Sequence, residues 1–231
     1  MNNKTAEIMS IGTELLLGDI VNTNSAFLAK QLSLIGINVY HQTVVGDNKE
    51  RIEKAIETAL ERSDILITTG GLGPTIDDIS KKCVCQVMGE ELVLDDKALD
   101  DIKSFFKAIN IKMTDNNINQ AYVPKNATIF YNQWGTAPGF ALSKNEKTVI
   151  MLPGVPSEME NMFEYYAKPI LAGQSDKGIF STNVKLFGAS ESAVEELLFD
   201  LMENGTNPTV APYAKLGEVE VRISALAENK E

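Results

Sequence analysis

Strand-like and helix-like segments alternate over the first 170 residues, and this alternation constrains the fold of the chain more than any other feature. Residues 6–11 form a short apolar run that ends at Gly12, and residues 24–35 carry apolar side chains at helical spacing. A second apolar run at 64–69 leads directly into Gly70. Such alternation predicts an α/β fold, with a mainly parallel sheet covered by helices on both faces.

The remaining segments continue the pattern. Further strands are predicted at 37–45, 128–131, 139–143 and 148–152, and further helices at 77–88 and 96–109. Two more helices are predicted to begin at Asp47 and at Ser157, which are followed by Glu50 and Glu160 at capping-box spacing. Ligands of parallel sheets bind at the carboxyl ends of the strands. Polar, glycine-marked or proline-marked turns follow four strands, at 12–14, 46–47, 70–78 and 153–158, so the site is expected there.

A second, smaller unit is expected after residues 172–178, which are polar, contain glycine and lack large apolar side chains. The predicted domains are therefore 1–171 and 176–231. The smaller one reads as a strand, a helix from Ser190, and a hairpin whose second strand, 218–227, alternates apolar and polar side chains. A β-α-β-β unit of this size has a thin core.

Charge and composition exclude several classes of function. The chain has 21 Lys and Arg against 32 Asp and Glu, a formal net charge of −11, so nucleic acid and anionic membranes are not expected as partners. No apolar stretch has the length of a membrane span and no signal-peptide core follows Met1, which predicts a cytoplasmic protein. The single histidine, His41, rules out a multi-histidine zinc site. Cys83 and Cys85 are interpreted as reduced, buried apolar residues.

The glycine-rich turn after the 64–69 strand is a candidate phosphate cradle. Glycines let the backbone approach an anion, and the helix that follows presents free N–H groups. The turn is neither a Walker loop nor a Gly-x-Gly-x-x-Gly motif, because no Lys-Ser/Thr pair follows Gly73. The alternative is a tight strand-to-helix connection that needs glycine for steric reasons alone.

Two carboxylates, Asp77 and Asp78, are expected to open the helix after that turn. Acidic residues in a first helical turn complement the helix dipole, which is one explanation for them. The other is a metal-assisted phosphate site, because two carboxylates repel a phosphate unless a divalent cation lies between them. Glu14 and Asp47, at the ends of neighbouring strands, add oxygen ligands suited to such a cation.

Two other segments carry side chains suited to ligand binding. Residues 22–25, with Asn24, supply hydrogen bonds for a sugar or base, and helix capping by Asn24 or Ser25 is the alternative. Thr136, in the glycine-containing loop 132–139, is a candidate contact for a phosphate or a hydroxyl group.

Four motifs occur in a fixed order along the chain. They are Gly12-Thr13-Glu14-Leu15-Leu16-Leu17-Gly18 with Asn22-Thr23-Asn24, Thr69-Gly70-Gly71-Leu72-Gly73-Pro74-Thr75 with Asp77-Asp78, Gly135-Thr136-Ala137-Pro138-Gly139-Phe140, and Pro153-Gly154-Val155-Pro156 with Glu158-Met159. Each motif is weak alone, but their order and spacing over residues 6–170 resemble those of the CinA (competence/damage-inducible protein) family. The similarity continues through the smaller unit.

The resemblance implies a three-layer α/β/α molybdopterin-binding-like domain followed by a small α+β KH-like domain. The KH-like domain is expected either to be whole or to end before its last helix. Longer members of the family carry a C-terminal nicotinamide-nucleotide deamidase domain, which is not expected here. Gly188-Ala189-Ser190-Glu191 lacks the second glycine of an RNA-binding Gly-x-x-Gly loop, so a structural or dimerisation role, and a homodimer, are expected of this unit.

The activity that the resemblance implies is metal-dependent hydrolysis of ADP-ribose to AMP and ribose 5-phosphate. Asp78, Asp47 and Glu14 are its expected catalytic residues, and Asp78, Asp77 and Glu14 the expected ligands of Mg²⁺ or Co²⁺. The expected substrate-binding residues are Asn24, Gly70, Gly71, Gly73, Pro74, Thr75, Lys81, Thr136, Pro153, Gly154 and Glu158. For Lys81, one turn after Asp78, a solvated surface lysine is the alternative.

One departure from the pattern of molybdenum-cofactor relatives supports a competing hypothesis. Molybdenum-cofactor relatives have Gly-Asp-Glu where this chain has Gly12-Thr13-Glu14, so one carboxylate is missing. The alternative function is therefore a non-catalytic module that binds a pterin or nucleotide.

Overall fold

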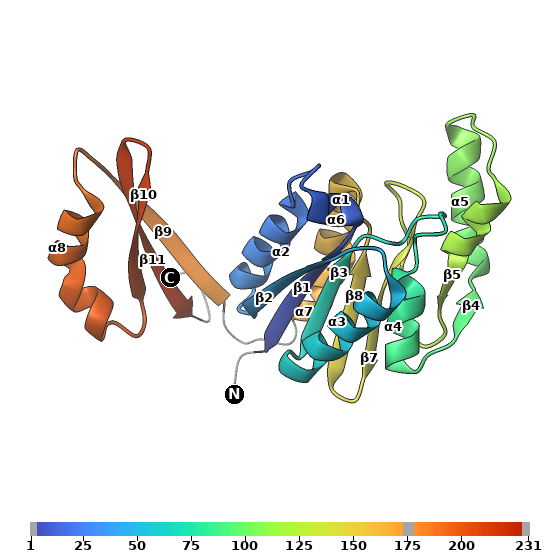
Figure 1. Ribbon diagram of the computed structural model, residues 1–231, viewed down its shortest axis with the longest axis horizontal. Helices are drawn as coiled ribbons and strands as arrows, with labels where there is room; N and C mark the ends of the chain where they lie inside the picture. The colour runs from blue at the N-terminus through green and yellow to red at the C-terminus, as the bar shows by residue number, and fades with distance from the viewer. Residues whose placement is uncertain (1–3, 173–177, 228–231) are drawn as a thin grey trace.

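The computed structural model describes residues 4–172 and 178–227, which form a large α/β domain and a small α+β domain (Figure 1). The large sheet has six strands in the order β2-β1-β3-β8-β7-β6. Their bounds are β1 Thr5–Ile11, β2 Asn38–Val45, β3 Ile65–Thr69, β6 Thr128–Phe130, β7 Gly139–Lys144 and β8 Lys147–Leu152. Strands β2, β1, β3 and β8 are parallel to one another. β7 runs antiparallel to β8, and β6 runs antiparallel to β7. The predicted mainly parallel sheet is confirmed.

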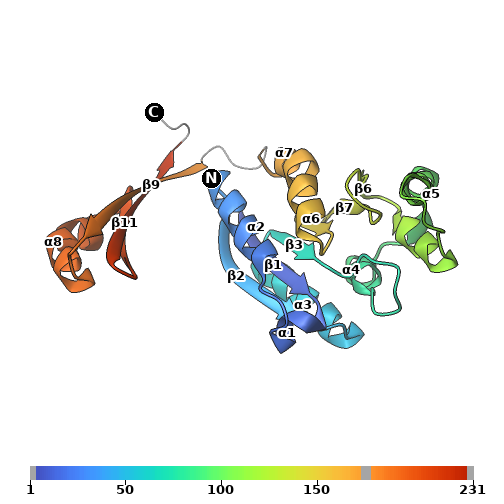
Figure 2. The ribbon, with the colours of Figure 1, turned by 90° about the horizontal axis from the view of Figure 1, so that it is seen from above.

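Helices cover both faces of this sheet, which makes three layers (Figure 2). One face is covered by α2 (Thr23–Leu34), α6 (Pro156–Met162) and α7 (Lys168–Ala172), and its core includes Ile8, Leu28 and Phe163. The other is covered by α3 (Lys49–Arg62) and α4 (Ser80–Met88). Cys83 and Cys85 are free and buried on α4, as predicted. The parallel strands are therefore apolar on both sides, as a doubly covered sheet requires.

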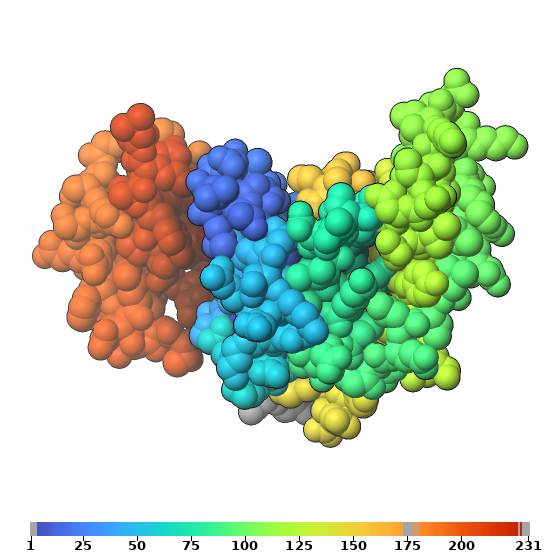
Figure 3. Space-filling model, turned by 45° about the vertical axis from the view of Figure 1, so that its right-hand side comes forward, coloured from blue at the N-terminus to red at the C-terminus, as the bar shows by residue number. Residues whose placement is uncertain are grey.

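An inserted unit between α4 and β6 projects from the large domain (Figure 3). It contains α5 (Asp96–Ala108), a 3-10 helix labelled η1 (Asp115–Ala121), and a two-stranded sheet of β4 (Leu92–Leu94) and β5 (Tyr122–Pro124). Only α5 was predicted, because three-residue strands and a polar 3-10 turn leave no periodic pattern in the sequence.

The small domain packs one helix on a three-stranded antiparallel sheet. Its elements are β9 (Gly178–Phe187), α8 (Glu191–Asn204), β10 (Thr209–Lys215) and β11 (Glu218–Ala227), with strand order β10-β11-β9. Val194 of α8 packs against Val219 and Val221 of β11. Ser190 caps α8 by accepting a hydrogen bond from the Ala193 N–H. The predicted β-α-β-β order is confirmed, with the small core that it implies.

Three predicted helix starts are wrong, each for a local reason. The helix after the glycine-rich turn begins at Ser80, because the Asp78 carboxylate accepts a hydrogen bond from the Thr75 N–H within the turn. α3 begins at Lys49 with Asn48 as its cap, so Asp47 lies outside it. α6 begins at Pro156, whose fixed φ suits a first helical position, and Ser157 caps nothing.

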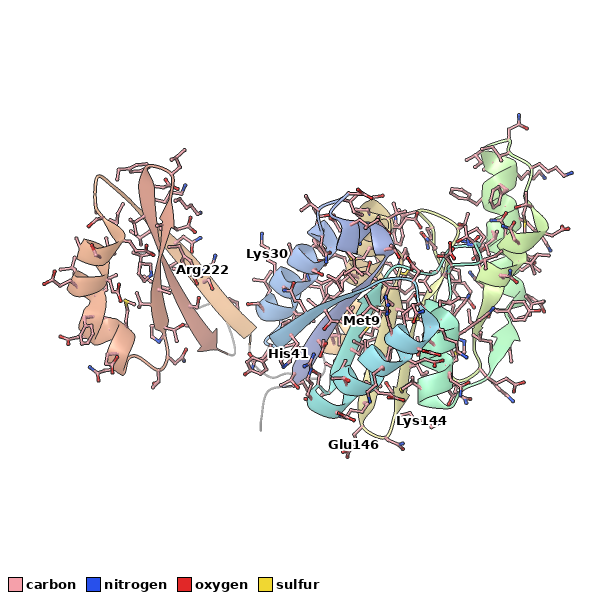
Figure 4. The ribbon with its side chains drawn as sticks, in the orientation of Figure 1. Met9, Lys30, His41, Lys144, Glu146 and Arg222 are labelled. Atoms are coloured by element: carbon pink, nitrogen blue, oxygen red, sulfur yellow. The ribbon has the colours of Figure 1, made fainter. Side chains whose placement is uncertain are left out.

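Two further features of the described residues concern surface and membrane. His41 lies exposed on edge strand β2, away from the turns at the carboxyl ends of the strands (Figure 4). None of the helices in the described part of the chain combines the length and the apolar character needed to cross a bilayer. Two short helical segments complete the large domain: α1 (Thr13–Leu17), which was not predicted, and η2 (Phe163–Ala167), a π-helical turn between α6 and α7.

Candidate functional site

The carboxyl ends of the parallel strands lie where α1 and α6 begin (Figure 1). A cavity of about 490 Å³ is lined by the turns at these strand ends. The turns after β1, β2, β3 and β8 all contribute to its wall. Of the predicted site residues, the following line it: Glu14, Asn24, Asp47, Gly70, Gly71, Gly73, Pro74, Thr75, Asp77, Asp78, Thr136, Pro153, Gly154 and Glu158. Lys81 is the one predicted residue outside this lining. Four separate motifs therefore meet in one place.

The glycine-rich turn is packed against its neighbours as well as exposed to the cavity. Gly70 has φ 102° and its N–H bonds the Leu152 carbonyl at 3.2 Å, which ties the turn to β8. A Cβ at Gly70 would lie 2.2 Å from the Ile11 carbonyl oxygen, and one at Gly71, with φ 68°, would lie 1.8 Å from Ser80 Oγ. The steric explanation of these glycines is therefore correct, and it is compatible with ligand binding.

Two of the predicted catalytic carboxylates accept hydrogen bonds from threonines: Asp47 links the turn after β2 to the start of α1, and Asp78 bonds within its own turn. Asp47 Oδ2 accepts hydrogen bonds from the Thr13 N–H at 2.9 Å and from Thr13 Oγ1 at 2.8 Å. Asp78 Oδ2 accepts from the Thr75 N–H at 2.8 Å and from Thr75 Oγ1 at 2.6 Å. Thr13, which stands where molybdenum-cofactor relatives have Asp, is thus the partner of Asp47. One oxygen of each carboxylate remains for a ligand.

The carboxylates do not form a preassembled metal centre. Within residues 4–172 and 178–227, no group of three or more His, Cys, Asp and Glu side chains is arranged to hold a metal ion. The Mg²⁺ or Co²⁺ ion expected at Asp78, Asp77 and Glu14 stays a prediction. It would need ligands from a bound molecule in addition to those of the protein.

Asn24 joins three segments of the cavity wall. Its Nδ2 donates to Thr69 Oγ1 at 2.9 Å and to the Gly154 carbonyl at 2.8 Å, and Thr69 Oγ1 donates in turn to the Pro153 carbonyl. These acceptors fix the orientation of the amide, and among the described residues the buried Asn24 Oδ1 has no hydrogen-bond partner. The capping alternative is wrong, because Asn22 caps α2. Asn24 Oδ1 is the natural acceptor for an N–H or O–H group of a ligand.

Glu158 is a half-buried carboxylate at the first turn of α6. Its Oε2 accepts a hydrogen bond of 2.6 Å from Asn132 Nδ2, which also donates to the Ala137 carbonyl. Burial raises the pKa of Glu158 above its usual value, and the Asn132 hydrogen bond opposes that shift. A Cβ at Gly135 would lie 2.1 Å from Glu158 Oε2, so the loop glycine makes room for the carboxylate.

Lys81 lies behind the cavity wall, so neither sequence interpretation of it is correct. The residue is buried, and its Nζ donates to the Asn119 carbonyl at 3.1 Å and the Gln120 carbonyl at 3.0 Å. Gln120 itself lines the cavity and donates from Nε2 to Thr136 Oγ1 at 3.0 Å. No motif marks Gln120 in the sequence, since η1 has no periodic pattern.

The cavity wall is strongly acidic. Its lining residues include five carboxylates (Glu14, Asp47, Asp77, Asp78 and Glu158) and, within the described residues, no Lys, Arg or His. Only polar backbone groups, hydroxyls and amides offset this negative charge. An anionic ligand is therefore repelled from this cavity unless a cation accompanies it.

The comparisons with known proteins agree with the motifs and the fold. Residues 7–173 match the family described as "Probable molybdopterin binding domain", and residues 181–231 match the "Damage-inducible protein CinA KH domain". A protein of Clostridium perfringens named as a competence-damage inducible protein is 52% identical over 227 residues, 98% of this chain and 55% of the relative. A CinA-like protein of Dictyoglomus thermophilum is 48% identical over 225 residues, 97% of this chain and 55% of the relative. The chain thus spans about half the length of these relatives.

Solved structures show the same architecture. The protein CinA of unknown function from Thermoplasma acidophilum is 37% identical, with a TM-score of 0.67 over 74% of this chain and 99% of that one. A molybdenum cofactor biosynthesis protein of Corynebacterium diphtheriae, 12% identical, has a TM-score of 0.51 over 75% of this chain and 98% of its own. The second similarity concerns the fold alone.

The expected hydrolysis of ADP-ribose is wrong. The matched family is described by molybdopterin binding, and the relatives named above are described as CinA or competence-damage inducible proteins, not as pyrophosphatases. In addition, Asp47 and Asp78, two of the three carboxylates that the reaction was expected to use, each have one oxygen engaged by a threonine, and the described residues contain no group of three or more side chains arranged to hold a metal ion. These findings favour the alternative, a pterin- or nucleotide-binding module.

Taken together, the two domain matches, the relatives of about 50% identity and the shared fold show what the chain is. The chain belongs to the CinA family, with a molybdopterin-binding-type domain followed by the KH domain of that family.

Proposed function

We propose that the cavity at the carboxyl ends of β1, β3 and β8 binds a phosphorylated pterin or nucleotide together with a divalent cation. The observation that carries the proposal is the composition of the cavity wall, in which glycine-rich turns meet five carboxylates and, in the part of the chain that the structure describes, no basic side chain. The description of the matched family as molybdopterin-binding supports a pterin as one ligand class. The fold supports the location, since ligands of parallel α/β sheets bind at this edge.

The charge balance is the reason for including a cation. A phosphate about 4 Å from one carboxylate is repelled by about 4 kcal/mol at an effective dielectric constant of about 20. Helix N-termini stabilise an anion by only about 1 kcal/mol, so α4 does not offset this repulsion. Mg²⁺ in such sites is commonly held by one or two carboxylates and by the phosphates of the ligand. Asp78 and Glu14 both line the cavity and are proposed to supply those carboxylates.

Asn24 and Glu158 are proposed to contact the rest of the ligand. The unpartnered Oδ1 of Asn24 is available to accept a hydrogen bond from a ring N–H or a hydroxyl group. Glu158, half-buried and held by Asn132, presents a second acceptor on the α6 side of the cavity. Pterins and nucleobases both carry N–H donors on one edge, so both classes fit this pair.

The substitution Asp78→Asn tests the role of the cation. Asparagine can still accept the two hydrogen bonds from Thr75, so the turn keeps its shape while one negative charge is lost. We expect the affinity for Mg²⁺-AMP, measured by isothermal titration calorimetry, to fall by about tenfold or more. The control Asp101→Asn removes an exposed carboxylate of α5 and should leave the affinity unchanged. An unchanged affinity in Asp78→Asn would remove this residue from the site.

A further inference from the structure

Lys81 is a buried cation that the proposed ligand contacts do not use. It is the second residue of α4 and is 7% exposed. In the described part of the chain its Nζ has no carboxylate partner within ion-pair distance, and its two hydrogen bonds go to backbone carbonyls of η1. Burying an ammonium group without a carboxylate is costly, whereas methionine fills similar space at no such cost. The position therefore has a role beyond filling space.

The two carbonyls lie at the carboxyl-terminal end of η1. Asn119 and Gln120 are among the last residues of this 3-10 helix, and the Asn119 carbonyl also accepts a hydrogen bond from the Tyr122 N–H at the end of the helix. A cation at that end adds a donor to these carbonyls and complements the helix dipole. Lys81 thereby attaches the inserted unit to α4, the helix that follows the glycine-rich turn.

Gln120 extends this attachment to the cavity. Its side chain is 2% exposed and is held at both ends: Oε1 accepts from Asn117 Nδ2 at 3.1 Å, and Nε2 donates to Thr136 Oγ1 at 3.0 Å. Both Gln120 and Thr136 line the cavity. A continuous series of hydrogen bonds thus runs from Lys81 through η1 to the 132–138 loop.

We propose that Lys81 is a positioning residue, whose ammonium group fixes Gln120 and through it the Thr136 side of the cavity. Its effect on ligand affinity depends on the proposed function, but its effect on the loop does not. The loop contains Trp134, the single tryptophan of the chain, which stacks on Tyr165 with 5.4 Å between ring centroids. Trp134 fluorescence therefore reports the loop without any ligand.

The first test compares Lys81→Met with Lys82→Met, which removes the exposed lysine next to it. Lys81→Met is expected to change the acrylamide quenching of Trp134 by about twofold and to lower the affinity for Mg²⁺-AMP by about tenfold. Lys82→Met should leave both unchanged. Gln120→Leu, which breaks the same series of hydrogen bonds at its next member, should reproduce the Trp134 change. If a folded Lys81→Met or Gln120→Leu leaves Trp134 unchanged, the proposal is overturned.

The second test uses the wild-type chain and pH. The pKa of Lys81 is lowered to about 8, mainly by burial and to a smaller extent by the charge of Lys82, while Cys85 and Asp78 oppose this shift. The groups that η1 presents to the ammonium are the Asn119 and Gln120 backbone carbonyls. Trp134 quenching should change with a midpoint at about pH 8 in the wild type and not in Lys81→Met. A midpoint retained in Lys81→Met would contradict the proposal. Failure of the wild type to bind any phosphorylated ligand, with both Trp134 effects present, would reject the proposed function and leave the positioning role intact.

Discussion

Replacing Gly70 by alanine is expected to lower the free energy of unfolding by about 3 kcal/mol and to remove ligand binding. The backbone of Gly70 has φ 102°, where an L residue is strained, and a Cβ there would lie 2.2 Å from the Ile11 carbonyl oxygen. That oxygen belongs to β1 and cannot move without distorting the strand. The turn must therefore shift away from β1, and the cavity changes shape with it. Urea unfolding and calorimetric titration with Mg²⁺-AMP measure the two effects.

Gly217→Ala is the matched control for this substitution. Gly217 has φ 80° in the β10–β11 hairpin, and a Cβ there would meet nothing within 4 Å. It therefore has the left-handed strain, about 1–2 kcal/mol, without the clash. Binding should be unchanged in this variant. Equal losses of stability in Gly70→Ala and Gly217→Ala would show that the close approach of the turn to β1 has no energetic weight.

Replacing Arg62 by glutamine is expected to lower the free energy of unfolding of the large domain, because it leaves the buried Glu7 carboxylate without its cation. The Glu7 side chain on β1 is 1% exposed, and Arg62 donates to both its oxygens, from Nε at 2.8 Å and from Nη2 at 2.9 Å. Thr43 Oγ1 supplies a third hydrogen bond of 2.7 Å. Lys54→Gln, which removes an exposed cation of α3, should change stability by less than about 0.5 kcal/mol.

The pH dependence of stability distinguishes the ion pair from simple packing. Burial raises the pKa of Glu7, but hydrogen bonds from Arg62 and Thr43 and the charge of Arg62 outweigh it, so the pKa lies below 4.5. A carboxylate with a lowered folded pKa stabilises the fold above its unfolded pKa, and this contribution is lost as pH falls. The stability difference between the wild type and Arg62→Gln should therefore shrink below about pH 4.5. A difference independent of pH would mean that the loss comes from packing.

The sequence predicted the sheet and the place of the cavity because both depend on repeated patterns. Apolar runs that end at glycine specify buried strands, and the turns after parallel strands must meet at one edge. The helix starts were less predictable, because a carboxylate before a helix has more than one possible partner. Asp47 and Asp78 bond Thr13 and Thr75 across turns, and only the folded backbone brings these groups together.

The polar residues that join α4 to the inserted unit were the hardest to predict. Lys81 was expected to face the ligand because it lies one turn after Asp78, but its side chain extends to η1, whose position has no periodic signal. Gln120 was missed for the same reason. In the small domain, the predicted alternating strand is present, and its apolar residues Val219 and Val221 pack in the core. The homodimer and the division of the chain at 171 and 176 stay predictions.

The most direct test of the proposed function is calorimetric titration of the chain with matched ligand pairs. Neopterin monophosphate and AMP are each compared with neopterin and adenosine, in Mg²⁺ and again in excess EDTA. If the proposed function is correct, at least one phosphorylated ligand binds in Mg²⁺, and removing either its phosphate or the cation weakens binding by about tenfold or more. Equal affinity with and without the phosphate, or with and without Mg²⁺, would contradict it.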